Sequence, residues 1–241
     1  MPPEIIVKPN SIAVLGYHSG SAGQTETWLE KVTGYHIACF VHETDEHQWT
    51  GVDPQKANEG RVSKRMDFPT KDSFKGRPLI ASINWIDHLK RLGINKVLPL
   101  TQGNRLRLRQ IKDCLQNGIE LITAIHPTVI VMPEVMIEPG VWISAGSIIG
   151  YKSEIQAGTM IGPSRVIIGQ HNVIERCTEI QPGTTLTGNV TVRECATIHA
   201  GVTVIPRVEI GHDAIVGAGA VGIENVPINR TVVGVPARIV K

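Results

Sequence analysis

Residues 173–204, VIERCTEIQPGTTLTGNVTVRECATIHAGVTV, place an aliphatic residue at every sixth position. The same spacing extends through most of the second half of the chain, at Val131, Ile137, Ile143, Ile149, Ile155, Ile161, Ile168, Ile174, Ile180, Leu186, Val192, Ile198, Val204, Ile210 and Val216. Four residues after most of these stands a small or β-branched residue. Such a hexapeptide repeat predicts an all-β, left-handed parallel β-helix, in which three repeats make one triangular coil. Residues one coil apart should then stack about 4.8 Å from each other.

One irregularity interrupts this repeat, because two isoleucines within residues 161–168 are seven positions apart instead of six. If the earlier register continued, Arg165 would face the interior, where an unpaired cation costs several kcal/mol. An extra residue within 162–165 makes Val166 the inward residue instead. We therefore predict a bulge at this turn, with His171 facing outward.

Residues 1–126 follow a different pattern, in which strand-like and helix-like segments alternate. Strands are predicted over 11–16, 35–41, 78–83, 95–100 and 119–125, and helices over 21–34, 85–93 and 104–118. This alternation predicts a Rossmann-like α/β domain over residues 1–126, followed by the β-helix domain over 127–241. Residues 43–76 are polar and poorly periodic, and we predict an irregular insertion whose role the sequence does not assign.

Composition and charge exclude several classes of function. The net charge is only +2, so we expect no nucleic-acid partner. The basic run Arg105, Arg107 and Arg109 is interpreted as the solvated face of a helix. The first residues lack the apolar core of a signal peptide, and no membrane span is expected.

The four cysteines have no metal-ligand spacing, which favours a reducing, cytoplasmic location and predicts no metal site. Cys177 and Cys195 are one predicted coil apart, and we expect them to stack at one corner as reduced thiols.

Four segments together resemble the PglD/NeuD-like family of bacterial sugar acyltransferases: residues 125–131, 180–192, 202–221 and 229–240, that is IHPTVIV, IQPGTTLTGNVTV, VTVIPRVEIGHDAIVGAGAV and NRTVVGVPARIV. Members of this family acylate amino sugars, including nucleotide-linked ones, or sialic acid. The resemblance implies a homotrimer, with acetyl-CoA or another short acyl-CoA in a groove between adjacent β-helices. It predicts an N-acyltransferase whose acceptor is a nucleotide-linked deoxyamino sugar, for surface polysaccharide or glycan biosynthesis.

The resemblance also implies positions for the acyl-transfer centre. Acyl transfer to an amine needs a proton acceptor and an N–H donor where the oxyanion develops. The family's oxyanion glycine corresponds to Gly188, and its base position, one coil earlier, is occupied by Gln170 beside His171. A second family histidine is replaced by Glu179. The acyl-CoA is expected to contact backbone at Gly188, Ala200, Gly201 and Gly219.

These replacements leave three interpretations open. His171 acts as the base, oriented by Glu179 or Gln170; or the amine attacks unaided and the CoA sulfur takes the proton; or the protein is a non-catalytic, sugar-nucleotide-binding relative. A sugar or sialic acid O-acetyltransferase is the alternative enzyme. His171 could also be an ordinary corner residue, and His199 and His212 are interpreted as surface residues.

A second predicted site lies in the first domain. A glycine-containing loop follows the first strand and precedes a helix, as in a phosphate cradle. The resemblance adds the end of the second strand, which holds the nucleotide in the family. The predicted sugar-nucleotide site comprises Gly16, His18, Gly20, His42 and Glu43. Tight turns without a ligand are the alternative for this loop.

Overall fold

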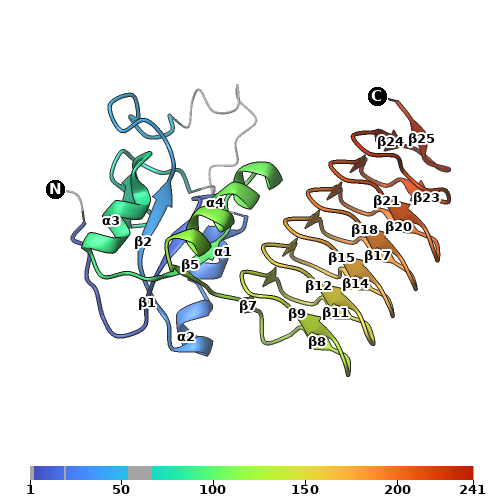
Figure 1. The fold of residues 1–241 in the computed structure, drawn as a ribbon, viewed down its shortest axis with the longest axis horizontal. Helices are drawn as coiled ribbons and strands as arrows, with labels where there is room; N and C mark the ends of the chain where they lie inside the picture. The colour runs from blue at the N-terminus through green and yellow to red at the C-terminus, as the bar shows by residue number, and fades with distance from the viewer. Residues whose placement is uncertain (1–2, 19, 54–66, 241) are drawn as a thin grey trace. The chain divides into compact units, whose positions relative to one another are not determined.

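The structure, a computed structural model, describes residues 3–18, 20–53 and 67–240. Contacts divide the chain into two compact units, the first comprising Met1–Gln102 and Lys112–Ile122, and the second Gly103–Ile111 and Thr123–Lys241 (Figure 1). Of the predicted 43–76 insertion, residues 54–66 lie outside the described residues. Within the described ranges, no helix has both the length and the apolar character that crossing a membrane requires.

The first unit is built on a six-stranded sheet in the order β3-β4-β2-β1-β5-β6. All neighbouring strands pair in parallel except β3 and β4. The strands are β1 (Ser11–Leu15), β2 (His36–His42), β3 (Ser73–Phe74), β4 (Arg77–Ala81), β5 (Lys96–Pro99) and β6 (Glu120–Leu121). Every residue of β1 is buried, as expected for the central strand of a sheet covered on both faces.

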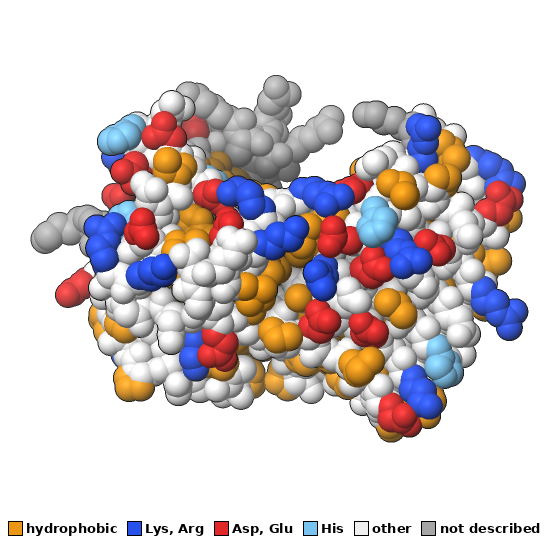
Figure 2. Space-filling model, in the orientation of Figure 1, with side chains coloured by type: hydrophobic (Ala, Val, Ile, Leu, Met, Phe, Trp, Pro, Cys, Tyr) orange, Lys and Arg blue, Asp and Glu red, His pale blue; other side chains and the backbone are white. Residues whose placement is uncertain are grey.

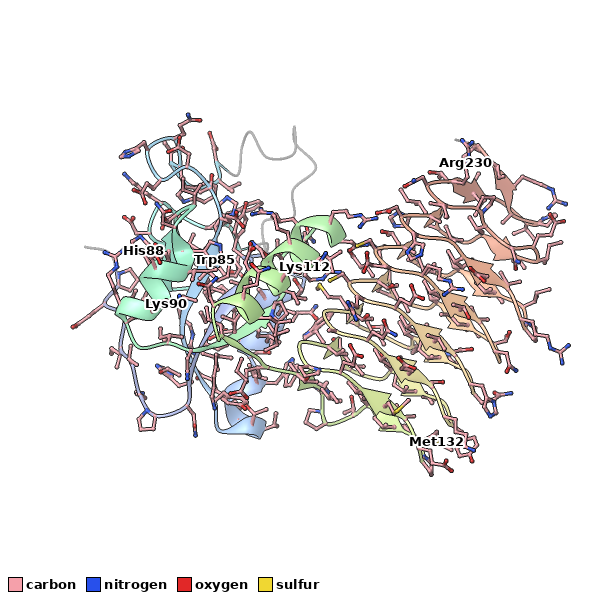
Figure 3. All side chains as sticks on the ribbon, in the orientation of Figure 1. Trp85, His88, Lys90, Lys112, Met132 and Arg230 are labelled. Carbon is pink, nitrogen blue, oxygen red and sulfur yellow. The ribbon has the colours of Figure 1, made fainter. Side chains whose placement is uncertain are left out.

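The helices depart from prediction at one place. The predicted helix over 21–34 is two short helices, α1 (Ala22–Glu26) and α2 (Leu29–Thr33). Near the break, two threonine hydroxyls donate to carbonyl oxygens of the preceding turn, Thr25 to Ser21 and Thr27 to Gln24, and such bonds compete with the helical pattern. Helices α3 (Trp85–Arg91) and α4 (Asn104–Gln116) form as predicted, and Trp85 of α3, labelled in Figure 3, is almost fully buried.

The second unit contains the left-handed β-helix, whose strands of two or three residues lie on three faces. Face 1 contains β7 (Ala124–Ile125), β10 (Trp142–Ile143), β13 (Met160–Ile161), β16 (Glu179–Ile180), β19 (Thr197–Ile198), β22 (Ile215–Val216), β24 (Thr231–Val233) and β25 (Arg238–Ile239). Face 2 contains β8 (Ile130–Val131), β11 (Ile148–Ile149), β14 (Ile167–Ile168), β17 (Thr185–Leu186), β20 (Thr203–Val204) and β23 (Val221–Gly222). Face 3 contains β9 (Met136–Ile137), β12 (Glu154–Ile155), β15 (Val173–Ile174), β18 (Thr191–Val192) and β21 (Glu209–Ile210). Corners are named below by the faces that they join. Met132 and Arg230 mark the first and last coils in Figure 3.

The predicted strand over 119–125 is split between the two units. Its first half, β6, pairs with β5, whereas its second half, β7, pairs with β10 and begins the β-helix. The inward positions of the hexapeptide repeat are fully buried from Ile143 to Val216. Val131 is 42% exposed, because no coil lies beneath the first one.

The one-residue irregularity is a bulge at corner 1–2, as predicted. Strand β11 pairs with β14 in a register of 19 residues (Ile149 with Ile168), whereas β14 pairs with β17 in a register of 18 (Ile168 with Leu186). Ser164 and Arg165 both adopt left-handed backbone conformations, with φ of 71° and 59°. Val166 then faces inward and is fully buried, so later coils keep the repeat.

The first half of α4 packs on corner 3–1 of the β-helix, and here the sequence interpretation is wrong for one residue. Arg107, expected in a solvated face, is fully buried. Its guanidinium donates to the carbonyl oxygens of Gly158 (2.8 Å) and Cys177 (2.9 Å), which belong to successive coils. Asn104 donates to the carbonyl oxygen of Cys195 on the next coil (3.0 Å). Burial lowers the pKa of Arg107, opposed by the nearby Cys177 and Glu179.

Candidate functional site

The predicted acyl-transfer residues Gln170 and Gly188 lie together at corner 2–3. A Cβ atom placed on Gly188 would stand 2.7 Å from Nε2 of Gln170, so the amide lies directly over the glycine. The Gln170 carbonyl accepts the N–H of Asn189 at 2.9 Å, which holds the two turns in register. No described residue accepts a hydrogen bond from the Gly188 N–H, so this donor can serve a ligand.

His171 and Glu179 are not brought to this pair. His171 is exposed at the left-handed corner position (φ 56°), and its ring packs edge-on against Tyr151, with centroids 5.7 Å apart. Tyr151 belongs to the coil before, whereas Gly188 belongs to the coil after. Glu179 lies in β16 on face 1, so within one chain it cannot orient His171 as the sequence interpretation required.

The backbone contacts predicted for acyl-CoA fall mostly at corner 1–2. A groove of about 500 Å³ runs there, lined by Ser164, Arg165, Ile167, Pro182, Gly183 and Thr185. Gly183, Gly201 and Gly219 stack above one another with φ near 70°, a conformation that glycine adopts without strain. Ala200 precedes Gly201 in this column and accepts the N–H of Gly219 at 2.8 Å. Gly188 lies at the opposite edge of face 2.

Several charged side chains of the β-helix form ion pairs, with one another or with α4. Arg193 pairs with Glu175 and with Glu209, each at 2.8 Å, and Arg105 pairs with Asp213 and Glu194. Figure 2 accordingly shows basic and acidic side chains interspersed on the visible face.

The predicted sugar-nucleotide residues of the first unit lie where parallel strands end, the usual ligand edge of such sheets. Gly16 follows β1, and a Cβ there would meet the Leu100 carbonyl oxygen at 2.9 Å, so only glycine fits. His18 accepts the N–H of Gly20 through Nδ1 at 3.1 Å. A hollow of about 420 Å³ is lined by His18, Gly20, Gly23, Gln24, Thr27, Asp67 and Lys75.

Strand β2 ends at His42, which Glu43 follows, beside aromatic rings that the sequence interpretation did not include. The His42 ring lies 4.8 Å from the ring of Tyr17 and 4.5 Å from that of Trp49, measured between centroids. Burial lowers the pKa of His42, opposed by Glu43, so the neutral ring is favoured. Flat, half-buried rings of this kind can stack on a nucleobase.

Solved structures with this architecture match nearly the whole chain. A mutant of perosamine N-acetyltransferase from Caulobacter crescentus, in complex with CoA and GDP-perosamine, is 26% identical to it. The match covers 96% of this chain and 97% of that one, with a TM-score of 0.75. The chain has the fold of the hexapeptide-repeat sugar acetyltransferases. The resemblance to this family that the sequence predicts is confirmed.

Two further members of this fold group are less similar in sequence. The acetyltransferase domain of PglB from Neisseria gonorrhoeae, in complex with acetyl coenzyme A, is 22% identical over 96% of this chain and 99% of that one, with a TM-score of 0.75. WeeI from Acinetobacter baumannii is 19% identical over 95% and 99%, with a TM-score of 0.76. A scan against protein-family models and a comparison with curated proteins give no match.

The sequence interpretation did not recognise one pair of polar side chains on the β-helix. His199 and Gln181 follow Ile198 and Ile180, and Nδ1 of His199 lies 3.2 Å from Oε1 of Gln181. Their separation of 18 residues was the available signal, because one-coil spacing stacks equivalent positions. The sequence interpretation weighed His199 alone, as a surface residue.

The cysteines provide a test that does not depend on activity. Cys177 and Cys195 are both buried at corner 3–1, and burial raises their pKa values to about 11 and about 12. A raised thiol pKa keeps the protonated, unreactive form at pH 8. We therefore expect iodoacetamide at pH 8 to leave both unmodified in the native protein and to alkylate them in urea, as measured by mass spectrometry. Native alkylation of either would show an accessible thiolate.

Proposed function

We propose that this protein is an acetyl-CoA-dependent N-acetyltransferase that acts on the amino group of a nucleotide-linked deoxyamino sugar. The observation that carries the proposal is the match along nearly the whole chain to an enzyme bound to CoA and GDP-perosamine. The predicted acyltransferase function, with acetyl-CoA as co-substrate, is supported by the same comparison. The N–H of Gly188, which donates to no described residue, gives this chain a donor suited to a developing oxyanion.

The two domains have separate roles in this proposal. Residues 1–126 form a Rossmann-like domain that binds the sugar nucleotide through Gly16, His18, Gly20, His42 and Glu43. Residues 127–241 form the β-helix that binds acyl-CoA and carries the transfer. The expected homotrimer and cytoplasmic location are kept as parts of the proposal, with surface polysaccharide or glycan biosynthesis as its setting.

The proposed transfer follows from the geometry of corners 1–2 and 2–3. The glycine column and groove at corner 1–2 offer bare backbone to the amide groups of the pantetheine arm. At corner 2–3 the Gly188 N–H holds the thioester oxygen, and the amide of Gln170 restricts where the acyl group lies. The acceptor amine then attacks the carbonyl carbon, and CoA leaves as the thiol. Because the His171 ring faces the preceding coil, we assign it no contact with the reacting atoms.

A thiol-release assay tests the proposal. Purified protein and acetyl-CoA are incubated with UDP-, dTDP- and GDP-linked amino sugars, and free CoA is measured together with the acetylated sugar. We expect release with at least one amino sugar and none with its hydroxyl counterpart. Release with hydroxyl sugars alone would favour the O-acetyltransferase, because a hydroxyl needs a base more than an amine does. Binding of sugar nucleotide without release from any short acyl-CoA would favour the non-catalytic relative.

His171→Ala tests the base predicted from the sequence. Because the ring packs on Tyr151 and not at Gly188, we expect kcat/KM to fall by less than about tenfold, below the usual range for loss of a general base. The measurement is thiol release at saturating acetyl-CoA. A fall of a thousandfold, with acetyl-CoA binding retained, would restore His171 as the base.

Arg165→Ala tests the groove. The bulge places this side chain in the lining of corner 1–2, where an anionic co-substrate such as CoA would meet a cation. We expect KM for acetyl-CoA to rise about fivefold to twentyfold with kcat little changed, because the lost contact is equal in ground and transition states. Arg230→Ala, an exposed arginine at corner 3–1, is the matched control. Equal KM values for the two variants would place the CoA phosphates elsewhere.

A further inference from the structure

A hydrogen-bonded chain of side chains crosses the outer surface of face 1. Nδ1 of His199 lies 3.2 Å from Oε1 of Gln181, and Nε2 of Gln181 lies 3.3 Å from Oε1 of Glu179. All three side chains are partly buried. The three residues span two successive coils, from β16 to the residue after β19.

The chemistry of these groups fixes the direction of the hydrogen bonds. An ionised carboxylate can only accept, so Glu179 must receive the N–H of the Gln181 amide. The amide oxygen of Gln181 therefore faces His199 and must receive its Nδ1–H. This assigns the proton of the neutral imidazole to Nδ1 and leaves the lone pair on Nε2. No described residue hydrogen-bonds to Nε2 of His199.

The charged groups around this chain support the same assignment. On α4, the charge of Arg107 interacts favourably with Glu179, the hydrogen-bond acceptor at the end of this chain. On the other side of β19, the next coil presents Ile215 and Gly217 at the corresponding positions, neither of which titrates. Glu179, with Arg107 beside it, is thus the charged group to which this chain of side chains is hydrogen-bonded.

His199 also belongs to corner 1–2, the corner that carries the groove. It begins the turn that contains Gly201, whose N–H donates to the carbonyl oxygen of Pro182 at 2.8 Å. Pro182 lines the groove and directly follows Gln181. His199 is therefore at the same corner as the glycine column proposed to hold acyl-CoA.

We propose that His199 is the general base of the transfer, with Gln181 and Glu179 as its positioning residues. This inference rests on the proposed function and names the proton acceptor at that site. As the acceptor amine forms the C–N bond, Nε2 of His199 takes its proton. The tetrahedral intermediate then collapses, the C–S bond breaks with its electron pair on sulfur, and the imidazolium returns the proton to the CoA thiolate.

Such a site is shared between two copies of the chain. His199 lies at corner 1–2 and Gly188 at corner 2–3, on opposite edges of face 2, so one prism cannot bring them together. In a closed ring of identical copies, each copy presents a different surface to each neighbour. The proposal therefore requires His199 of one copy to face Gly188 of the next.

The pH dependence of kcat/KM tests the base. We expect His199→Ala to lower kcat/KM at least about a hundredfold and to abolish the fall toward acid pH. Gln181→Glu places a carboxylate against the imidazole, so the acidic limb should move to higher pH by roughly one unit. His212→Ala, another histidine of the β-helix, should stay within about twofold of wild type. A His199→Ala enzyme that keeps the acidic limb, whether its rate is unchanged or uniformly lowered, would overturn the assignment.

Mixed assembly tests the sharing of the site. His199→Ala and Gly188→Val, each inactive alone, are co-expressed and purified together after circular dichroism shows that each folds. Random mixing in a ring of three leaves about a quarter of the sites with both native groups, so about a quarter of wild-type activity should return. No recovery would overturn the shared site. A wild type that is silent toward every acceptor would overturn the proposed function, whereas an active wild type with an active His199→Ala would overturn this inference alone.

Discussion

Replacing Arg107 by methionine should lower the free energy of unfolding by about 3–5 kcal/mol. The fully buried guanidinium donates to Gly158, Cys177 and the side chain of Asn104. Methionine fills much of the same space but donates nothing, so buried carbonyl oxygens on two coils would lose their donors. Arg107→Lys should recover little of the lost stability, because one ammonium group cannot replace a planar guanidinium that donates to carbonyl oxygens on two coils. Urea-induced unfolding followed by circular dichroism measures the loss.

Arg105→Met is the matched control, from the same helix two residues earlier. Its side chain is 58% exposed and pairs with Asp213 and Glu194 at the surface. Exposed pairs contribute about 0–1 kcal/mol, so the expected loss is small. Similar losses in the two variants would mean that Arg107 does not hold the coils together.

Gly169→Ala should destabilise the β-helix by about 3 kcal/mol or more. A Cβ at this position would lie 2.5 Å from the carbonyl oxygen of Thr187 and 2.7 Å from its carbonyl carbon. Both atoms belong to the backbone of the next coil, so no side-chain rotation relieves the overlap. The coils would have to separate at corner 2–3, next to Gln170 and Gly188. Both the unfolding midpoint in urea and the rate of thiol release should fall.

Gly222→Ala provides the comparison for this prediction. Gly222 is another glycine of the β-helix, but a Cβ there would first meet Val204 at 3.6 Å, an ordinary van der Waals contact. We expect its stability to stay within about 0.5 kcal/mol of wild type. If both alanines are tolerated equally, then close coil-to-coil approach is not what requires glycine at 169.

Periodicity was sufficient to predict the β-helix, because its coils repeat one local pattern of inward and outward residues. It also located the bulge, because burying an unpaired Arg165 costs much more free energy than burying Val166, which excludes the register that places Arg165 inside. Residues 21–34 were predicted as one helix because their apolar spacing is helical throughout. The threonine hydroxyls that bond to the backbone and interrupt the helix do not change that spacing. Arg107 was misinterpreted for a related reason: the amphipathic spacing of α4 does not say which of its residues meet a neighbouring coil.

The candidate site was only partly accessible from the sequence. One-coil spacing correctly paired Gln170 with Gly188, because stacking follows directly from the repeat. It did not exclude His171, whose ring direction depends on the left-handed backbone at the corner and on Tyr151. The link from His199 through Gln181 to Glu179 depends on side-chain rotamers, which the repeat does not determine.

The packing of α4 on three consecutive coils has a consequence for how the β-helix opens. In a stack where each coil contacts only its neighbours, opening starts at the ends and proceeds one coil at a time. Asn104 and Arg107 hold the coils of Gly158, Cys177 and Cys195 along one helix, so these three should open as a single cooperative unit. Amide exchange should be slowest there and faster toward both ends. Gln170, Gly188 and His199 all lie within or beside these coils, so the groups proposed for chemistry sit in the least frayed part of the stack.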